Sequence, residues 1–197
     1  MRKYDIKQSP IQPYLVSRDR VLSYGLRPNL LHFQTMDVQQ LTKILVSRPD
    51  LPLLTGITLR NYCGPEDVET WIQLRRKAFA RQRLGIGEWD QADFEREFLS
   101  KSWWNSSNMW FADDSSGISL GTICLARRQG RAGDRPVIHW LAVSPVARRR
   151  GIGRLLVSAL EAAVWDAGER QIWLETHALW REASEFYRAL GYRAADQ

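Results

Sequence analysis

The sequence predicts an α/β (α+β) protein in which helices flank a central sheet. Strand and helix patterns follow one another from residue 57 onward in the order strand, two helices, three strands, helix, strand and helix. The 197 residues suit one domain of ordinary size. Hydrophobic residues make up 44% and charged residues 25% of the chain, which are the proportions of a globular protein with an apolar core.

The first predicted elements are a strand and two helices. Residues 57–62 alternate as a strand does. A helix over residues 65–79 follows, with acidic residues in its first turn, where the helix dipole favours negative charge. Asp90 is the expected N-cap of the second helix, and Trp89 is expected to pack on Phe94 as a hydrophobic staple.

Three strands are predicted next. Residues 109–112 and 120–126 form two of them, joined by a polar loop that ends in Gly117. A turn over residues 130–136 leads to the third strand, residues 137–143. Its near-continuous apolar run is typical of a central strand that is buried on both faces.

The last elements are a helix, a strand and a helix. Residues 152–164 place apolar side chains at the i, i+3, i+4 spacing over three turns, and Gly168 can close this helix. A strand over residues 172–176 follows. A final apolar stripe, residues 183–190, predicts a helix that ends at Gly191.

Residues 1–54 differ from the rest and are expected to form an N-terminal extension to a domain over residues 55–197. Five of the eight prolines lie in the extension, and its hydrophobic periodicity is weak. One short helix is expected after Asp37 as N-cap, because Val38, Leu41, Ile44 and Leu45 would share one face. No residue of the extension indicates chemistry.

The net charge and the two cysteines limit which partners and which compartment are expected. The net charge of +6 and the pI of about 9.6 favour anionic partners or a solvated basic face. Cys63 and Cys124 match no metal-ligand spacing and sit in apolar contexts, so both are expected to be buried thiols in a reducing compartment. Without a membrane-spanning run or a signal-peptide core, the protein is expected to be cytoplasmic, with no membrane partner.

Many of the arginines fall in one short stretch that includes the turn VSPVARRRGIGRLL, residues 143–156. Arginines repel one another and glycines start helices poorly, so this turn is costly. The costs are understandable if a phosphate binds there. The first amides of a helix lack acceptors, the helix dipole adds positive potential, and glycines let a phosphate approach. Nearby arginines add charge-assisted contacts. The basic residues of the stretch are Arg127, Arg128, Arg131, Arg135, Arg148, Arg149, Arg150 and Arg154.

Two nucleotide motifs do not fit the turn. A P-loop needs Lys-Ser or Lys-Thr after its last glycine, and a dinucleotide fingerprint needs glycine where Leu156 stands. Instead, Arg148-x-x-Gly151-x-Gly153 after an apolar strand resembles the coenzyme A pyrophosphate loop of the GNAT superfamily of N-acyltransferases. The segment Ala183-x-x-x-Tyr187-x-x-x-Gly191-Tyr192 is similar to the last helix of that family. The resemblance covers about residues 57–192.

The resemblance implies a mixed, largely antiparallel central sheet flanked by helices, and acetyl-CoA as cosubstrate without a metal. Backbone amides of the arginine-glycine turn would bind the pyrophosphate. The strand ending at Val143 would splay from the strand that begins at Ile172 and pair with the pantetheine. The residues expected to contact the cosubstrate are Leu141, Ala142, Val143, Arg148, Arg149, Arg150, Gly151, Ile152, Gly153, Arg154 and Tyr187.

The same resemblance assigns catalytic roles. Tyr187 is placed as the general acid that protonates the coenzyme A thiolate, and the Leu141 amide would polarise the thioester carbonyl. The base that deprotonates the acceptor amine is open between His139, Glu175 and ordered water. His139 titrates near neutrality by type, whereas Glu175 would need burial to raise its pKa. All three side chains also have a plainer interpretation. His139 and Tyr187 can be core residues, and Glu175 can be a substrate contact.

The sequence departs from the family pattern in two places. Trp180 stands where the family often has an asparagine that contacts the cofactor, and the usual final pair of strands after Tyr192 is almost absent. The substrate side of the fold is therefore expected to be open, or to be completed by the N-terminal extension or by another subunit.

The expected reaction is acetyl transfer from acetyl-CoA to a primary amine of a small molecule or a protein; the fold does not fix which. Two alternatives remain from other classes. One is a catalytically silent acyl-CoA-binding sensor or interaction domain. The other, which is less favoured, is a basic nucleic-acid-binding module whose affinity would fall steeply with salt. Whether the protein forms a homodimer is open.

Overall fold

The computed structural model describes residues 38–80, 88–130, 133–178 and 180–195. Within these ranges the strands form one seven-stranded sheet in the order β2-β3-β4-β5-β6-β1-β7. The pairs β1–β7, β2–β3, β3–β4 and β4–β5 are antiparallel, whereas β5 and β6 are parallel. The predicted mixed, largely antiparallel sheet is therefore confirmed. The strands are β1 (Val38–Ile44), β2 (Ile57–Asn61), β3 (Met109–Asp114), β4 (Ser119–Gly130), β5 (Gly133–Val143), β6 (Gln171–His177) and β7 (Arg193–Ala194).

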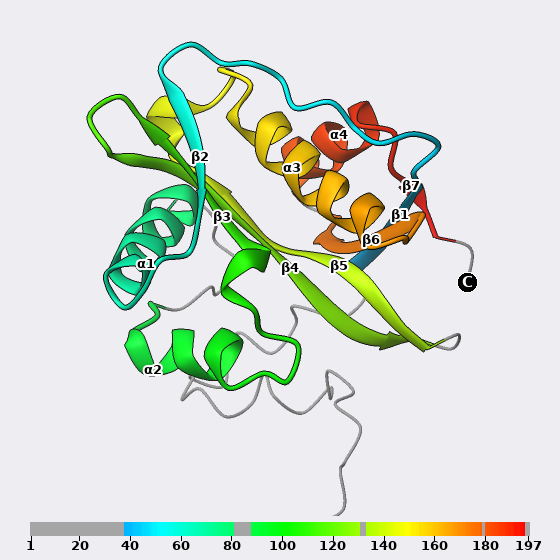
Figure 1. Cartoon of the computed structure of the whole chain (residues 1–197), viewed down its shortest axis with the longest axis horizontal. Helices are drawn as coiled ribbons and strands as arrows, with labels where there is room; N and C mark the ends of the chain where they lie inside the picture. Colours follow the sequence, from blue (N-terminus) through cyan, green and yellow to red (C-terminus); the bar gives the residue numbers. More distant parts are fainter. Residues whose placement is uncertain (1–37, 81–87, 131–132, 179, 196–197) are drawn as a thin grey trace, which may run out of the picture. The chain divides into compact units, whose positions relative to one another are not determined.

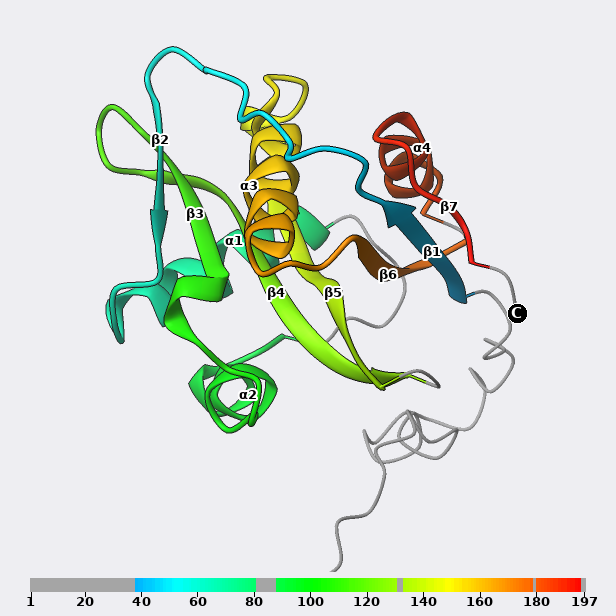
Figure 2. The same ribbon diagram turned by 45° about the vertical axis from the view of Figure 1, so that its right-hand side comes forward.

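Helices cover both faces of the sheet (Figure 1, Figure 2). One face holds α1 (Glu66–Phe79) and α2 (Gln91–Phe94), which continues directly as a π-helix (Glu95–Leu99). The other face holds α3 (Ile152–Asp166) and α4 (Arg181–Ala189). Two single 3₁₀ turns, Ser106–Asn108 and Pro145–Ala147, lie in the connections. All four predicted helices after residue 57 are present.

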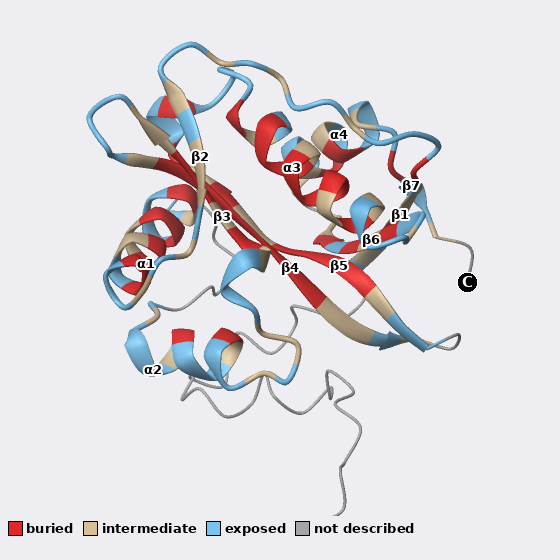
Figure 3. Cartoon of the chain, in the orientation of Figure 1, coloured by how far each residue is buried: buried red, intermediate tan, exposed pale blue. Residues whose placement is uncertain are grey.

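Each face of the sheet has its own apolar core, and the central strands between the two cores are the most buried (Figure 3). The core under α3 is mainly aliphatic, with Ile123, Ile138 and Leu156 among its members. The core under α1 and α2 is aromatic, and Trp71 and Phe98 lie at its centre. The run over residues 137–142 is apolar apart from His139 because β5 faces both cores.

The predicted cap of α2 is present. The Asp90 side chain accepts a hydrogen bond from the Asp93 amide at 2.9 Å, and the Asp93 side chain accepts from the Asp90 amide at 3.1 Å. The predicted staple takes a different form, because Trp89 and Phe94 both pack on the Trp71 ring, at 5.4 and 5.3 Å between centroids. The long aromatic side chain of Trp71 fills the space between them.

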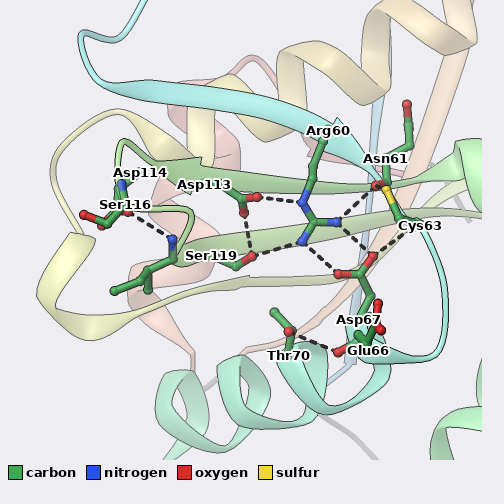
Figure 4. Close-up of polar contacts among 11 residues, drawn as sticks. Arg60, Asn61, Cys63, Glu66, Asp67, Thr70, Asp113, Asp114, Ser116 and Ser119 are labelled. Carbon is green, nitrogen blue, oxygen red and sulfur yellow. Dashed lines mark hydrogen bonds and ion pairs between the residues drawn. The ribbon is translucent and has the colours of Figure 1, made fainter.

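An ion-pair network fastens the start of α1 to the outer strands (Figure 4). Arg60 on β2 donates two hydrogen bonds to Asp67 in α1, each of 2.8 Å, and one of 2.6 Å to Asp113 on β3. The Asp67 carboxylate also accepts a hydrogen bond from the Cys63 amide at 2.7 Å. One guanidinium thus binds both carboxylates, and the buried Asp67 has a cation and several hydrogen-bond donors beside it, which lowers the cost of burying its charge.

Residues 38–44 form a strand, so the short helix predicted there is wrong; its predicted N-cap, Asp37, lies outside the described residues. β1 lies between β6 and β7 in the sheet (Figure 2). The Thr42 hydroxyl donates to the Ile172 carbonyl at 3.0 Å, and the Leu45 amide donates to the Arg170 carbonyl at 2.7 Å. Pairing with strands far along the chain therefore overrides the weak helical spacing. β1 completes the sheet beside the two-residue strand β7.

Two smaller expectations are also corrected. Cys124 is buried as predicted, but Cys63 is exposed, because it follows the outermost strand β2. The turn predicted over residues 130–136 is shorter, since β4 runs to Gly130 and β5 begins at Gly133. Among the described residues, no helix is both long and apolar enough to cross a membrane.

Candidate functional site

A β-bulge in β5 shapes the centre of the sheet. Ala142 pairs with Thr122 and His139 pairs with Cys124, so Trp140 and Leu141 together face the single residue Ile123 of β4. Trp140 has a φ of 52°, which is unusual for a residue other than glycine. The bulge points the side chains of both His139 and Trp140 towards the aromatic core, where each contacts other rings.

The bulge lies where β5 leaves its parallel neighbour β6. The two strands pair only at Val137 with Trp173 and at Ile138 with Leu174. β5 continues to Val143 and β6 to His177 without a further pair among the described residues. The carboxyl ends of the two strands are therefore apart, which agrees with the splay that the family resemblance implies.

The N-terminus of α3 follows directly after the end of β5 and one 3₁₀ turn. Its N-cap, Gly151, has a φ of 86°, Arg149 has a φ of 63°, and no side chain caps the helix. The exposed side chains of Arg149, Arg150 and Arg154 surround this end. Free amides, the helix dipole and these arginines together form a positive site that suits an anion.

The other arginines of the basic stretch are engaged elsewhere. Arg127 pairs with Glu169, Arg128 pairs with Glu175 at 2.8 Å, and the Arg135 guanidinium lies 4.4 Å from the centre of the Trp173 ring. Arg148 donates a hydrogen bond of 2.7 Å to the Ala78 carbonyl at the end of α1. This hydrogen bond ties the Arg148 side chain to the end of α1, and the contact of Arg148 with the cosubstrate stays a prediction. Arg131 lies outside the described residues.

The two glycines of the turn have packing roles as well. A Cβ atom on Gly151 would come within 3.1 Å of the Leu54 side chain, and one on Gly153 within 3.2 Å of the Phe186 ring. The sequence suggested only that glycine lets a phosphate approach. In the structure, Gly153 also lets α4 pack closely against α3, and Gly151 also adopts a left-handed conformation that favours glycine.

A cavity of about 410 Å³ lies along one flank of α3 and is also lined by Lys43 of β1. Arg154 and Ser158 line it from α3, and Asp50 and Leu51 line it from the loop between β1 and β2. Of the three arginines at the start of α3, Arg154 lines this cavity.

Tyr187 lies on the inner face of α4, with 7% of its surface exposed. Its ring packs edge-on against Phe186 at 5.3 Å and Tyr192 at 5.5 Å between centroids. Burial raises the pKa of the Tyr187 phenol, so the group holds its proton at neutral pH. This state suits a proton donor, and it equally suits a core residue.

The two candidate bases lie in different surroundings. His139 is buried in the aromatic core, and burial lowers the pKa of its imidazole even though the nearby Glu97 carboxylate opposes this change. Its Nε2 atom lies 2.9 Å from Glu97 Oε1. Glu175 is exposed on β6, where it pairs with Arg128 and accepts a hydrogen bond from Gln40 at 3.1 Å. Nothing at Glu175 provides the burial that a base at this position would need.

Glu97 is a site residue that sequence reasoning missed. A signal was present, because Glu97 lies three residues after Phe94, next to Phe98, on the apolar side of the second helix. An acid in an apolar stripe needs a partner. The partner here is on β5, more than forty residues along the chain.

Trp180, which replaces the family asparagine, connects α4 to α1. It stands at the N-cap position of α4 and stacks on Phe79 at 5.6 Å between ring centroids. Phe79 also packs edge-on against Trp140 at 5.9 Å. The aromatic core thus reaches from the bulge in β5 to the start of α4. The described residues contain no group of three or more His, Cys, Asp or Glu that could hold a metal.

Comparison with known proteins agrees with this architecture. A mycothiol acetyltransferase from Arthrobacter sp. is 25% identical over 90% of this chain and 54% of its own length. The chain spans about half the length of the curated relatives it matches. A GCN5-related N-acetyltransferase from Sphaerobacter thermophilus superposes with a TM-score of 0.64 at 20% identity, over 81% of this chain and 48% of that chain.

A second solved structure is that of AAC(6')-Iy in complex with the bisubstrate analog CoA-S-monomethyl-acetylneamine. It superposes with a TM-score of 0.54 at 19% identity, over 72% of this chain and 93% of that chain. The model of the Acetyltransferase (GNAT) family matches residues 68–192, which is well over half of the sequence. The chain therefore belongs to the GNAT acetyltransferase family.

Proposed function

We propose that the protein is an N-acetyltransferase that moves an acetyl group from acetyl-CoA directly to a primary amine. The observation that supports this most strongly is the start of α3. Its amides have no side-chain cap, and the three arginines around it form no ion pair with a described residue. This positive site directly follows the strand that bulges and parts from its neighbour. Such a combination suits a ligand with a pyrophosphate and a long flexible arm.

The backbone around α3 would bind the pyrophosphate. The amides of residues 149–154 would donate hydrogen bonds to it, and Arg149, Arg150 and Arg154 would add charge-assisted contacts. The pantetheine arm would enter between the diverging ends of β5 and β6. There the backbone of Val143 could pair with it as a neighbouring strand would.

The acetyl group would lie at the bulge. Because the bulge interrupts the regular ladder between β4 and β5 at Leu141, the Leu141 amide would be available to polarise the thioester carbonyl. The amine nitrogen would attack the carbonyl carbon while His139 takes the proton that the amine loses. The carbon–sulfur bond would then break, and the Tyr187 hydroxyl would protonate the departing thiolate.

The names of the curated relatives favour a small-molecule acceptor, although one similar structure is that of the ribosomal-protein-S18-alanine N-acetyltransferase from Escherichia coli. The curated relatives from Arthrobacter sp. and Rhodococcus erythropolis are named mycothiol acetyltransferases, and one of the superposed structures is a complex with the bisubstrate analog CoA-S-monomethyl-acetylneamine. Because the chain spans about half the length of those relatives, this choice of acceptor is part of the proposal. The cytoplasm, where acetyl-CoA is made and used, is the compartment we propose.

The proposal is tested by an acceptor screen with acetyl-CoA, in which release of the free thiol is followed. The panel contains aminoglycosides, amino sugars, cysteine derivatives, polyamines and peptides with free amino termini. Amine-dependent thiol release that the Tyr187→Phe variant largely loses is the expected result. Tight coenzyme A binding without turnover of any amine would instead favour the silent acyl-CoA-binding domain. Failure to bind coenzyme A at all would overturn both.

A further inference from the structure

Glu97 lies where the backbone is irregular in both elements that meet there. It stands in the π-helix that follows α2, where the Ser100 amide donates to the Glu95 carbonyl at 2.9 Å across five residues. Opposite it, β5 has its bulge and the positive φ of Trp140. π-Helical turns and strained residues both cost stability and are frequent at functional sites.

Both residues that the bulge turns towards this face contact the same carboxylate oxygen. His139 Nε2 lies 2.9 Å from Glu97 Oε1, and Trp140 Nε1 donates to that oxygen at 3.4 Å. The His139 contact is too oblique to satisfy the buried Nε2 atom with a full hydrogen bond. Catalytic hydrogen bonds are often poorly aligned before substrate binds and tighten in the complex.

Among the groups around His139 that the structure describes, Glu97 is the acid that favours protonation of its imidazole. Rings of Phe98, Trp103 and Trp140 lie within 5.5–6.0 Å of the imidazole centroid. Lys101, after the π-helix, and Arg128, on β4, both oppose protonation of His139, whereas Glu97 favours it. Arg75 on α1 acts on Glu97, and the buried thiol of Cys124 lies opposite His139 on β4. Among residues 38–80, 88–130, 133–178 and 180–195, these are the charged and titratable groups found to act on the pair.

We propose that Glu97 is a positioning residue for His139. Its carboxylate directs the Nε2–H edge of the imidazole into the core and leaves Nδ1 to take the proton from the acceptor amine. When that proton arrives, one N–H bond of the amine breaks, one forms at Nδ1, and Glu97 stabilises the resulting imidazolium. The inference rests on the proposed function, in which His139 is the base.

The first test needs no acceptor. The imidazole signals of the chain's three histidines are titrated by NMR, and His139→Asn assigns the signal of His139. Glu97→Gln keeps the size of the side chain and removes its charge, so His139 should titrate at a lower pH than in the wild type. Glu95→Gln, an exposed position of the same π-helix, is the matched control and should leave the titration unchanged. In Glu97→Asp, which retains the charge on a shorter side chain, His139 should titrate at a pH between those of the wild type and of Glu97→Gln.

The second test uses the amine that the acceptor screen identifies. In Glu97→Gln, the acidic limb of the kcat/KM profile should move to lower pH, and kcat should fall by about tenfold, part of the ~10²–10⁴ that a general base contributes. An unchanged His139 titration in both Glu97 variants overturns the proposal.

The failures of the two proposals are distinguishable. If His139→Asn keeps full turnover, His139 is not the base and Glu97 has no role in catalysis, while acetyl transfer itself stands. If no amine is acetylated, the proposed function fails, and the NMR titration still decides whether Glu97 controls His139.

Discussion

The Lys43 ammonium group lies 2.8 Å from both carboxylate oxygens of Glu161. Glu161, on α3, is 3% exposed, and it also accepts a hydrogen bond of 2.8 Å from the Tyr192 hydroxyl. Lys43 is on β1, Glu161 on α3 and Tyr192 directly before β7. This one buried carboxylate therefore ties the N-terminal strand to the helix and to the end of the domain.

Lys43→Met should destabilise the domain, because it leaves the buried Glu161 charge without its cation. Removing one partner of a buried pair costs about 3–5 kcal/mol, and the lower end applies here since Tyr192 still donates to Glu161. Chemical denaturation gives the free energy of unfolding. Arg48→Gln is the control, because its pair with Asp166 is on the surface, and it should change stability little. Equal stability of the two variants would contradict the role of Lys43.

Replacing an arginine at the start of α3 should weaken coenzyme A binding without loss of stability. Arg154→Gln should lower affinity by about tenfold, the effect of losing roughly 1.5 kcal/mol of charge-assisted contact. Calorimetry measures it, and Arg127→Gln, which removes the same charge from the Glu169 pair, is the matched control. If both variants bind coenzyme A equally, the positive site at α3 is not the pyrophosphate site.

A DNA affinity that exceeds the coenzyme A affinity would favour the nucleic-acid alternative.

Gly153→Val should reduce stability as well as coenzyme A binding. The added side chain would meet the Phe186 ring, whose Cζ atom lies 3.2 Å from the position of the first added carbon. Overpacking of this kind costs about 1–3 kcal/mol. Thermal unfolding with and without coenzyme A separates the two effects. The double variant Gly153→Val with Phe186→Ala should recover part of the stability, and no recovery would show that the Phe186 contact is not the cause.

Tyr187→Phe should lower turnover by about 10²-fold and leave coenzyme A affinity unchanged, because it removes only the hydroxyl group that would protonate the thiolate. The ring keeps its packing against Phe186 and Tyr192, so the free energy of unfolding should change little. Steady-state kinetics with the identified amine measure the effect. Wild-type turnover in this variant would make Tyr187 a core residue alone.

The stability of the domain should fall as the pH falls below about 6.5, in part because of His139. Burial lowers the pKa of His139 in the folded state from its ordinary value of 6.5, so the unfolded chain takes up the proton first. The stabilisation is complete above pH 6.5 and is lost as the pH falls towards the lower folded value. The free energy of unfolding should therefore decline less steeply in His139→Gln than in the wild type. Parallel declines would exclude this contribution.

Much of the helical structure follows from local sequence. The capping box at Asp90, the stripe of α3 and the glycines at 168 and 191 all depend on residues within one or two turns of one another. Such contacts form wherever the segment is placed, so they can be predicted without knowledge of the fold. The RxxGxG turn and the Tyr187 helix belong to the same class, and they were enough to indicate the family.

The remaining features depend on residues far apart in the chain. Residues 38–44 become a strand only because β6 and β7, about 130 to 150 residues later, offer free edges. Arg127 pairs with Glu169 and Arg128 with Glu175, so the positive charge that is left for an anion lies mainly on the three arginines at the start of α3.

By itself, the sequence determined the four helices after residue 57, the arginine-glycine turn before α3 and the family, because each of these is recorded in short-range spacing. Tertiary structure alone decided that β1 completes the sheet, that Cys63 is exposed and that Glu97 meets His139. These features depend on burial and on pairing between distant segments. Neither produces a pattern within one segment that could be read from the sequence.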